Sequence, residues 1–156
     1  MQWTARHHGF TPLTTCETEY SLLARAPEKE LIPAMRKHGV ALLPYYPLAS
    51  GFLTGKYQRN TLKPEGARLT KGKRYEDMFM TPANWARLEK LTAFAQARGR
   101  TLLELALSWL AAQPVVATVI AGATKPEQLE ANVKAADWAL TTEELQQIDT
   151  ITTNMQ

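Results

Sequence analysis

The stretch "ATVIAGATKPEQLEANV" (residues 117–133) changes its pattern midway, from residues typical of a strand to residues typical of a helix. Residues 117–123 are mostly apolar, as expected of a buried strand. Pro126 stands at a plausible first helical position, and Gln128 and Asn132 are spaced to share one helix face. The helix N-terminus and Lys125 could therefore bind an anion beyond the strand. The alternative is a plain capped helix on the surface.

The same alternation extends in both directions along the chain. A helix is expected over 28–38, and the apolar run "VALLPY" (40–45) follows it as a second buried strand. With a short strand at 13–16, three strands separated by helices predict an α/β fold with a parallel sheet and two open edges. Further helices are expected at 2–8, 82–98, 101–113 and 126 to about 135. A capping box formed by Thr141 and Glu144 is expected to open a final helix. Residues 58–80 are expected to form a long loop.

Composition places the chain among single soluble domains. It has 156 residues, of which 45% are hydrophobic and 21% charged. No apolar run approaches the roughly 18 residues of a membrane helix, and the polar N-terminus does not read as a secretory signal. Cys16 stands alone and cannot form an internal disulfide. These features predict a cytoplasmic protein that does not enter a membrane.

Charge is distributed unevenly along the sequence. Residues 55–75 carry seven basic side chains and one acidic one, whereas residues 126–156 carry six acidic side chains and one basic one. The basic segment suits a phosphate-bearing partner, or it is a solvated loop. No recognition motif accompanies the charge, so nucleic acid is not expected as a partner.

The stretch "YYPLASGFLTGKY" (45–57) superficially resembles the phosphate-binding loop of ATPases. That loop requires G-x-x-x-x-G-K-[ST], in which the last hydroxyl holds Mg²⁺. Here Ser50 stands at the first glycine position, and Tyr57 replaces the small hydroxyl residue. The stretch is therefore not an ATPase loop, although it keeps the ingredients of an anion site.

Three stretches together resemble the successive strand-end segments of aldo-keto reductases. They are "CETEYSLLAR" (16–25), "PYYPLASGFLTGKY" (44–57) and "IAGATKPEQLEANV" (120–133), and the resemblance runs in unbroken order from about Gly9 to Ile151. These enzymes are (β/α)₈ TIM barrels whose sites lie at the C-terminal ends of the strands. The resemblance implies that residues 1–156 are one incomplete barrel domain. It would be the C-terminal, NADP-binding half, beginning inside the fifth helix and containing strands six to eight.

The resemblance also implies the cofactor, NADP(H), and the residues that hold it. Each matched position takes a role from the family. Tyr45 would stack on the nicotinamide, the pyrophosphate would be lined by Pro47, Leu48, Ala49 and Ser50, and the phosphates would be reached by Lys56 and Arg68. Gly122 would allow the backbone to approach the cofactor closely. The 2′-phosphate would be received by Thr124 and Lys125, and the adenine would be held by Gln128 and Asn132.

Two positions depart from the family pattern. Glu17 stands where the family usually has a Gln that bonds the nicotinamide carboxamide. An ionised carboxylate only accepts hydrogen bonds, so the donor that the Gln amide would supply is lost. Ala131 replaces a frequent acidic residue near the adenine amine. Both departures suggest weaker or altered contacts with the cofactor.

The family's catalytic Asp, Tyr, Lys and His come from strands two to four, which have no counterpart here. Carbonyl reduction needs a proton donor beside the oxygen, and no matched position provides one. No catalytic residue and no metal site are therefore expected. The first hypothesis is a split or truncated NADPH-dependent reductase that is inactive alone and needs the missing N-terminal half. The alternatives are a non-enzymatic module that binds a dinucleotide or a partner, and a homodimer of two half-barrels joined through their open strand edges.

Overall fold

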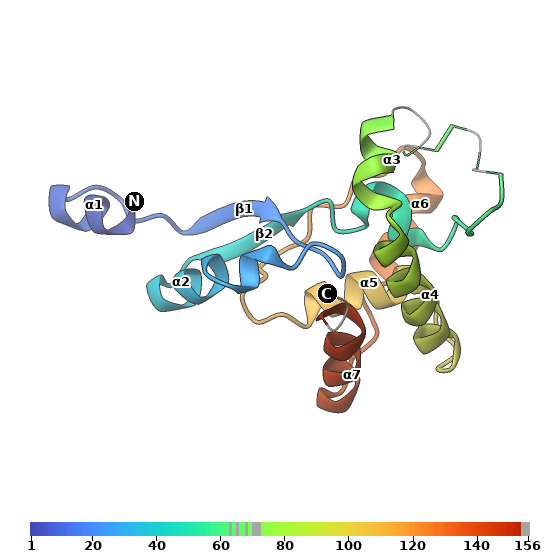
Figure 1. Ribbon diagram of the computed structural model, residues 1–156. Coiled ribbons are helices and arrows are strands. Elements are labelled where there is room, and N and C mark those ends of the chain that lie inside the picture. Colours follow the sequence, from blue (N-terminus) through green and yellow to red (C-terminus); the bar gives the residue numbers. More distant parts are fainter. Residues whose placement is uncertain (63, 65, 68, 70–72, 154–156) are drawn as a thin grey trace.

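The computed structural model describes residues 1–62, 64, 66, 67, 69 and 73–153. Its sheet contains two parallel strands, β1 (Thr15–Glu19) and β2 (Ala41–Tyr45), in a register that pairs Thr15 with Ala41 and Glu19 with Tyr45. The first strand was expected at 13–16, so it begins later and runs further than its sequence predicted. The architecture is α/β, as the alternation of patterns indicated (Figure 1).

The connection between the strands contains a short 3₁₀ turn, η1 (Ala26–Glu28), and the helix α2 (Leu31–His38). Helix α2 buries Ile32 and Met35, which share its inner face. Gly39 adopts a left-handed conformation with φ 66° and ends the helix. The backbone N–H of Val40 then bonds the carbonyl of Met35 at 2.9 Å, which directs the chain straight into β2.

The third expected strand is only partly formed. Residues 115–120 run parallel to β2, with hydrogen bonds from Leu42 N–H to the Val115 carbonyl (2.7 Å) and from Ala117 N–H to the Leu42 carbonyl (3.0 Å). The N–H of Ile120 also donates to the Pro44 carbonyl at 3.1 Å. These contacts are too few for a regular ladder, so the sheet of the described residues has two strands and not three. The paired segment overlaps the strand expected at 117–123 only in residues 117–120, and it pairs with β2 alone.

Helices make up most of the remaining chain. The region 58–80, expected to be a loop, contains a short helix, α3 (Lys73–Phe79), whose one buried residue is Phe79. The remaining helical elements are α1 (Gln2–His8), the 3₁₀ turn η2 (Ala49–Thr54), α3 (Lys73–Phe79), α4 (Pro82–Gln96), α5 (Leu102–Ala111), α6 (Pro126–Lys134) and α7 (Thr142–Thr153). Within the described residues, none of these helices is long and apolar enough to cross a bilayer.

Helix α5 forms the centre of the hydrophobic core. Its sequence is apolar around most of its circumference, and Leu105, Trp109 and Leu110 are completely buried. It packs against α4, α6 and the turn η2. Burial of each such side chain contributes about 1.5–3 kcal/mol, so this helix fixes the position of the turn that follows β2.

A polar cluster ties the first connection to the C-terminal helix. The guanidinium of Arg25 donates to Glu28 at 2.7 Å, to Asp149 at 2.7 Å and to the Thr152 hydroxyl at 2.6 Å. Burial alone would lower the pKa of Arg25, but the hydrogen bonds to the two carboxylates outweigh it and raise that pKa. Burial, together with the 2.6 Å bond to Glu28, raises the pKa of Tyr20. The Arg25 guanidinium is therefore charged and the Tyr20 phenol is neutral.

Candidate functional site

The turn η2, which begins four residues after the end of β2, contains two of the four described non-glycine residues with a positive φ angle. Ala49 and Ser50 have positive φ angles of 46° and 56°, and Gly51 follows with φ 96°. Non-glycine residues adopt such angles only where the surrounding structure imposes them, and such positions cluster at functional sites. A Cβ at Gly51 would lie 3.2 Å from Lys56 Nζ, so the absence of a side chain there lets the lysine ammonium approach the turn.

Ser50 carries an unusual polar group at this turn. The residue is 5% exposed, and its hydroxyl is buried without a hydrogen-bond partner among the described residues. An unpaired buried hydroxyl costs about 1–3 kcal/mol, so such groups are rare unless a ligand or water completes them. The Ser50 hydroxyl could complete its hydrogen bonding with an anionic oxygen.

The start of α6 is organised by a different contact. The side-chain oxygen of Gln128 accepts hydrogen bonds from the Thr124 N–H at 2.8 Å and from the Thr124 hydroxyl at 3.1 Å. Lys125 is the N-cap residue of α6 and makes no side-chain cap bond. Its side chain is exposed and adds a positive charge beside the helix N-terminus.

The turn after β2 and the start of α6 border one cleft with a volume of about 640 Å³. This volume lies within the range of small-molecule and cofactor sites. Nine of the residues singled out from the sequence line it together. They are Tyr45, Pro47, Leu48, Ser50, Lys56, Gly122, Thr124, Gln128 and Asn132. The structure thus gathers residues that lie up to 87 positions apart in the chain, from Tyr45 to Asn132, at the end of the sheet.

Three of the described residues singled out from the sequence are not among the lining residues. Glu17 is exposed on β1, one strand away, and Ala49 is the completely buried first residue of the turn η2. Lys125 is exposed outside the cleft. Arg68 lies outside the described residues. Spacing along the chain predicted proximity to the strand ends, but not the direction of each side chain.

Sequence reasoning also missed some of the lining residues. Tyr46, Gly51 and Thr54 lie in the stretch "YYPLASGFLTGKY" and could have been found there, because the strained turn brings them to the same edge. Leu103 comes from α5, and nothing in the sequence distinguishes it from the other leucines of that helix. It forms part of the apolar wall of the cleft.

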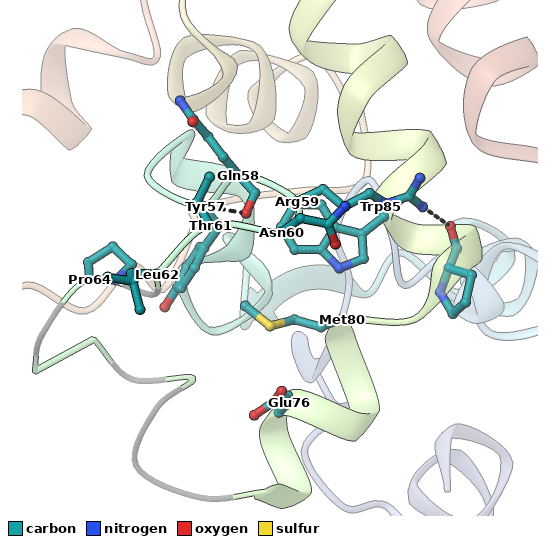
Figure 2. A pocket seen from close by; sticks show the side chains of 11 residues that line it. Tyr57, Gln58, Arg59, Asn60, Thr61, Leu62, Pro64, Glu76, Met80 and Trp85 are labelled. Atoms are coloured by element: carbon teal, nitrogen blue, oxygen red, sulfur yellow. Dashed lines mark hydrogen bonds between the residues drawn. The ribbon is translucent and has the colours of Figure 1, made fainter.

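A second cavity of about 460 Å³ lies beside the loop that follows η2, between that loop, α3 and the start of α4. Figure 2 shows the Trp85 indole and the Met80 thioether facing this space, with Glu76 on its opposite side. Arg59 points away toward α4, where it donates to the Pro82 carbonyl at 3.3 Å and lies 3.6 Å from Glu89. None of the predicted site residues that the structure describes borders this cavity.

An α/β fold with a cleft at the carboxyl ends of its parallel strands defines a class of ligand-binding enzymes and binding proteins. The model of the aldo/keto reductase family matches residues 1–153. The chain belongs to this family.

Several curated proteins are similar to the chain. An L-glyceraldehyde 3-phosphate reductase of Escherichia coli O157:H7 is 38% identical over 149 residues, covering 92% of this chain and 42% of the relative. A probable voltage-gated potassium channel subunit beta of Arabidopsis thaliana is 36% identical over 124 residues, covering 78% and 38%. An NADH-specific methylglyoxal reductase of Escherichia coli strain K12 is 36% identical over 124 residues, covering 79% and 37%. The chain spans about two fifths of the length of these relatives.

Proposed function

We propose that residues 1–156 form a single incomplete aldo-keto reductase barrel domain, the C-terminal half that binds NADP(H). In this proposal the chain belongs to an NADPH-dependent enzyme that reduces a carbonyl to an alcohol. Catalysis requires residues that this chain does not supply, so the chain alone is inactive. A complementary N-terminal half would close the sheet through its open strand edges and complete the site.

The cleft at the strand ends is the observation that carries the proposal. It gathers nine residues of the predicted cofactor set, and it combines a lysine ammonium with a buried hydroxyl that has no partner among the described residues. Both groups suit a pyrophosphate, because charge-assisted hydrogen bonds to phosphate oxygens are shorter and stronger than neutral ones. The donor set therefore fits the dinucleotide.

Each part of the cleft has a distinct task in the proposal. Ser50 and Lys56 hold the pyrophosphate, and the half-exposed ring of Tyr45 orients the nicotinamide. NADPH supplies the hydride when it is bound. At the other end, Gln128 presents only its NH₂ group to the base, because its oxygen is already bonded to Thr124. Lys125 attracts the 2′-phosphate from outside the cleft.

The names of the relatives support a second candidate function. They include reductases and a protein described as a potassium channel subunit beta, so family membership leaves open whether a member acts by catalysis or by binding. The alternative is a non-enzymatic module that binds the dinucleotide or a protein partner. It shares the cleft with the first proposal and differs from it in requiring no complementary half.

Calorimetric titration tests the cofactor and its discrimination. NADPH should bind the chain, and Lys125→Gln should weaken NADPH more than NADH because only NADPH carries the 2′-phosphate. Lys134→Gln, at the other end of the same helix, is the matched control and should change neither affinity. Equal losses for both dinucleotides in Lys125→Gln would remove the 2′-phosphate assignment.

An activity assay separates the two candidates. The chain mixed with NADPH and a reactive aldehyde should oxidise NADPH no faster than buffer alone. Activity that appears on adding an N-terminal half of a related reductase supports the split enzyme, and continued inactivity of a complex that forms supports the binding module. Turnover by the chain alone would contradict the claim that it lacks a proton donor.

A further inference from the structure

Alternate residues of β1 and β2 face opposite sides of the sheet, and burial distinguishes the two sides. Leu42 and Pro44 of β2 are fully buried, so the side that carries them packs on the core. Tyr45 faces the other side and is 40% exposed, and in the parallel register it pairs with Glu19 of β1. Glu17, two residues earlier on β1, is exposed as well. We call the side that carries Tyr45, Glu19 and Glu17 the open face of the sheet.

The open face is negatively charged. Glu17 and Glu19 are the only acidic or basic side chains within β1 and β2. Neither carboxylate forms an ion pair with another residue that the structure describes. Glutamate carboxylates are ionised at neutral pH, so two negative charges stand on this face with no cation beside them among the described residues.

Tyr45 connects these charges to the cleft. It lines the cleft, and its ring meets the ring of Tyr46 edge-on with centroids 5.3 Å apart. Neighbouring strands lie about 4.8 Å apart and successive residues of a strand about 3.3 Å, so Glu19 stands directly beside Tyr45 and the backbone of Glu17 is about 8 Å from it. A flat ring that stacks on Tyr45 therefore lies within the range of both carboxylates, because salt screens charges only beyond about 10 Å.

The dinucleotide of the proposed function changes its charge at this position. Its nicotinamide ring is positively charged when oxidised and neutral when reduced, whereas the pyrophosphate assigned to Ser50 and Lys56 is the same in both forms. We propose, resting on that function, that Glu17 and Glu19 make the cleft bind the oxidised, cationic ring more tightly than the reduced ring. The two glutamates thus determine which redox form of the cofactor the chain prefers.

The same two charges favour carbonyl reduction. In that reaction a hydride, which is one proton with two electrons, passes from the reduced ring to the carbonyl carbon. A second proton reaches the carbonyl oxygen from a donor that this chain does not supply. The ring becomes positive as the hydride leaves. Carboxylates that already stand beside the ring stabilise this charge without having to reorganise.

Exposure to solvent limits the size of the preference. The attraction between two charges falls with their distance and with the dielectric constant around them. Because the open face contacts solvent, each carboxylate should change the ratio of the two dissociation constants by about 3-fold, and both together by about 10-fold. High salt should reduce this ratio by screening the carboxylates.

Calorimetric titration of the full chain with NADP⁺ and with NADPH tests the proposal. The wild type should bind NADP⁺ more tightly than NADPH. Glu17→Gln and Glu19→Gln remove the charge and keep the side-chain shape, so each should weaken NADP⁺ by about 3-fold and leave NADPH unchanged. Glu143→Gln, at an exposed position of α7, is the matched control and should change neither affinity. Circular dichroism checks that every variant is folded.

NAD⁺ and NADH provide an independent pair of ligands. They differ in the same ring charge and lack the 2′-phosphate, so the two glutamine variants should shift their ratio by the same factor. Equal losses of the oxidised and reduced forms would overturn the proposal, because a hydrogen bond and not a charge would then be lost. Ratios that stay at the wild-type value would overturn it too. In both outcomes the dinucleotide still binds and the proposed function stands, whereas binding of neither form would remove the proposed function as well.

Discussion

The side-chain oxygen of Gln128 accepts two hydrogen bonds from Thr124, one from its N–H and one from its hydroxyl. The backbone N–H can only donate, so the amide oxygen must face Thr124 and the NH₂ group must face elsewhere. Gln128 thus shapes the turn before α6 and lines the cleft at the same time.

Two substitutions at Gln128 separate these roles. Gln128→Ala removes both the acceptor for Thr124 and the NH₂ group. NADPH should therefore bind about 10-fold more weakly, the effect of losing one or two hydrogen bonds. Gln128→Glu keeps the acceptor for Thr124 but loses the NH₂ group, so the turn should persist while affinity still falls. Calorimetry gives the affinity, and Gln146→Ala on the exposed side of α7 is the control. Unchanged affinity in both variants would contradict a base contact by Gln128.

Ser50 should show opposite effects on stability and on binding. Because its hydroxyl is buried without a partner among the described residues, Ser50→Gly should leave the free energy of unfolding unchanged or raised, and it also relieves the positive φ of 56°. The same change should reduce NADPH affinity by about 10- to 100-fold, through loss of a charge-assisted bond. Urea unfolding and calorimetry give the two quantities. Reduced stability with unchanged affinity would assign Ser50 a purely structural role.

Arg25 should contribute strongly to stability. Its side chain is 15% exposed and joins Glu28, Asp149 and Thr152. Breaking a fully buried ion pair costs about 3–5 kcal/mol, and since Asp149 is half exposed we expect about 2 kcal/mol for Arg25→Met. Arg36→Met, at an exposed site on α2, should cost less than about 0.5 kcal/mol. Equal unfolding midpoints for the two variants would show that the cluster does not hold α7.

Glu104 should make stability depend on pH. It caps α5 by accepting from the Thr101 N–H at 2.7 Å, and this bond together with the neighbouring Arg100 lowers the pKa of the Glu104 carboxyl. A lowered pKa in the folded state adds stability above the ordinary Glu range, and that stability disappears as pH falls through the lowered value. The difference in unfolding midpoint between the wild type and Glu104→Gln should shrink over that range. A difference that stays constant down to low pH would contradict the cap.

Local sequence patterns correctly predicted the helix ends that depend on residues close together in the sequence. Pro126 opens α6 and Gly39 closes α2 as the sequence indicates, and the Thr141/Glu144 capping box forms with bonds of 2.9 and 3.2 Å. Thr101 and Glu104 form the same motif, and their spacing would have predicted it.

Other features depend on partners that no local pattern specifies. Residues 117–123 have the composition of a strand. Their segment makes only a few backbone hydrogen bonds, all to β2, and these do not form a regular ladder. Helix α3 was missed because it is short and buries only Phe79. For the site, the strand ends were predictable, whereas the outward direction of Lys125 depends on how α6 packs.

Mapping NADPH on the isotope-labelled chain by nuclear magnetic resonance tests the central claim most directly. Backbone amide shifts should change most in residues 45–56 and 120–132, which border the cleft from two sides. Small changes are expected around Arg59 and Trp85, at the second cavity. An absence of shift changes at high NADPH, or changes concentrated at the second cavity, would contradict the proposal that this chain is the cofactor-binding half of a reductase.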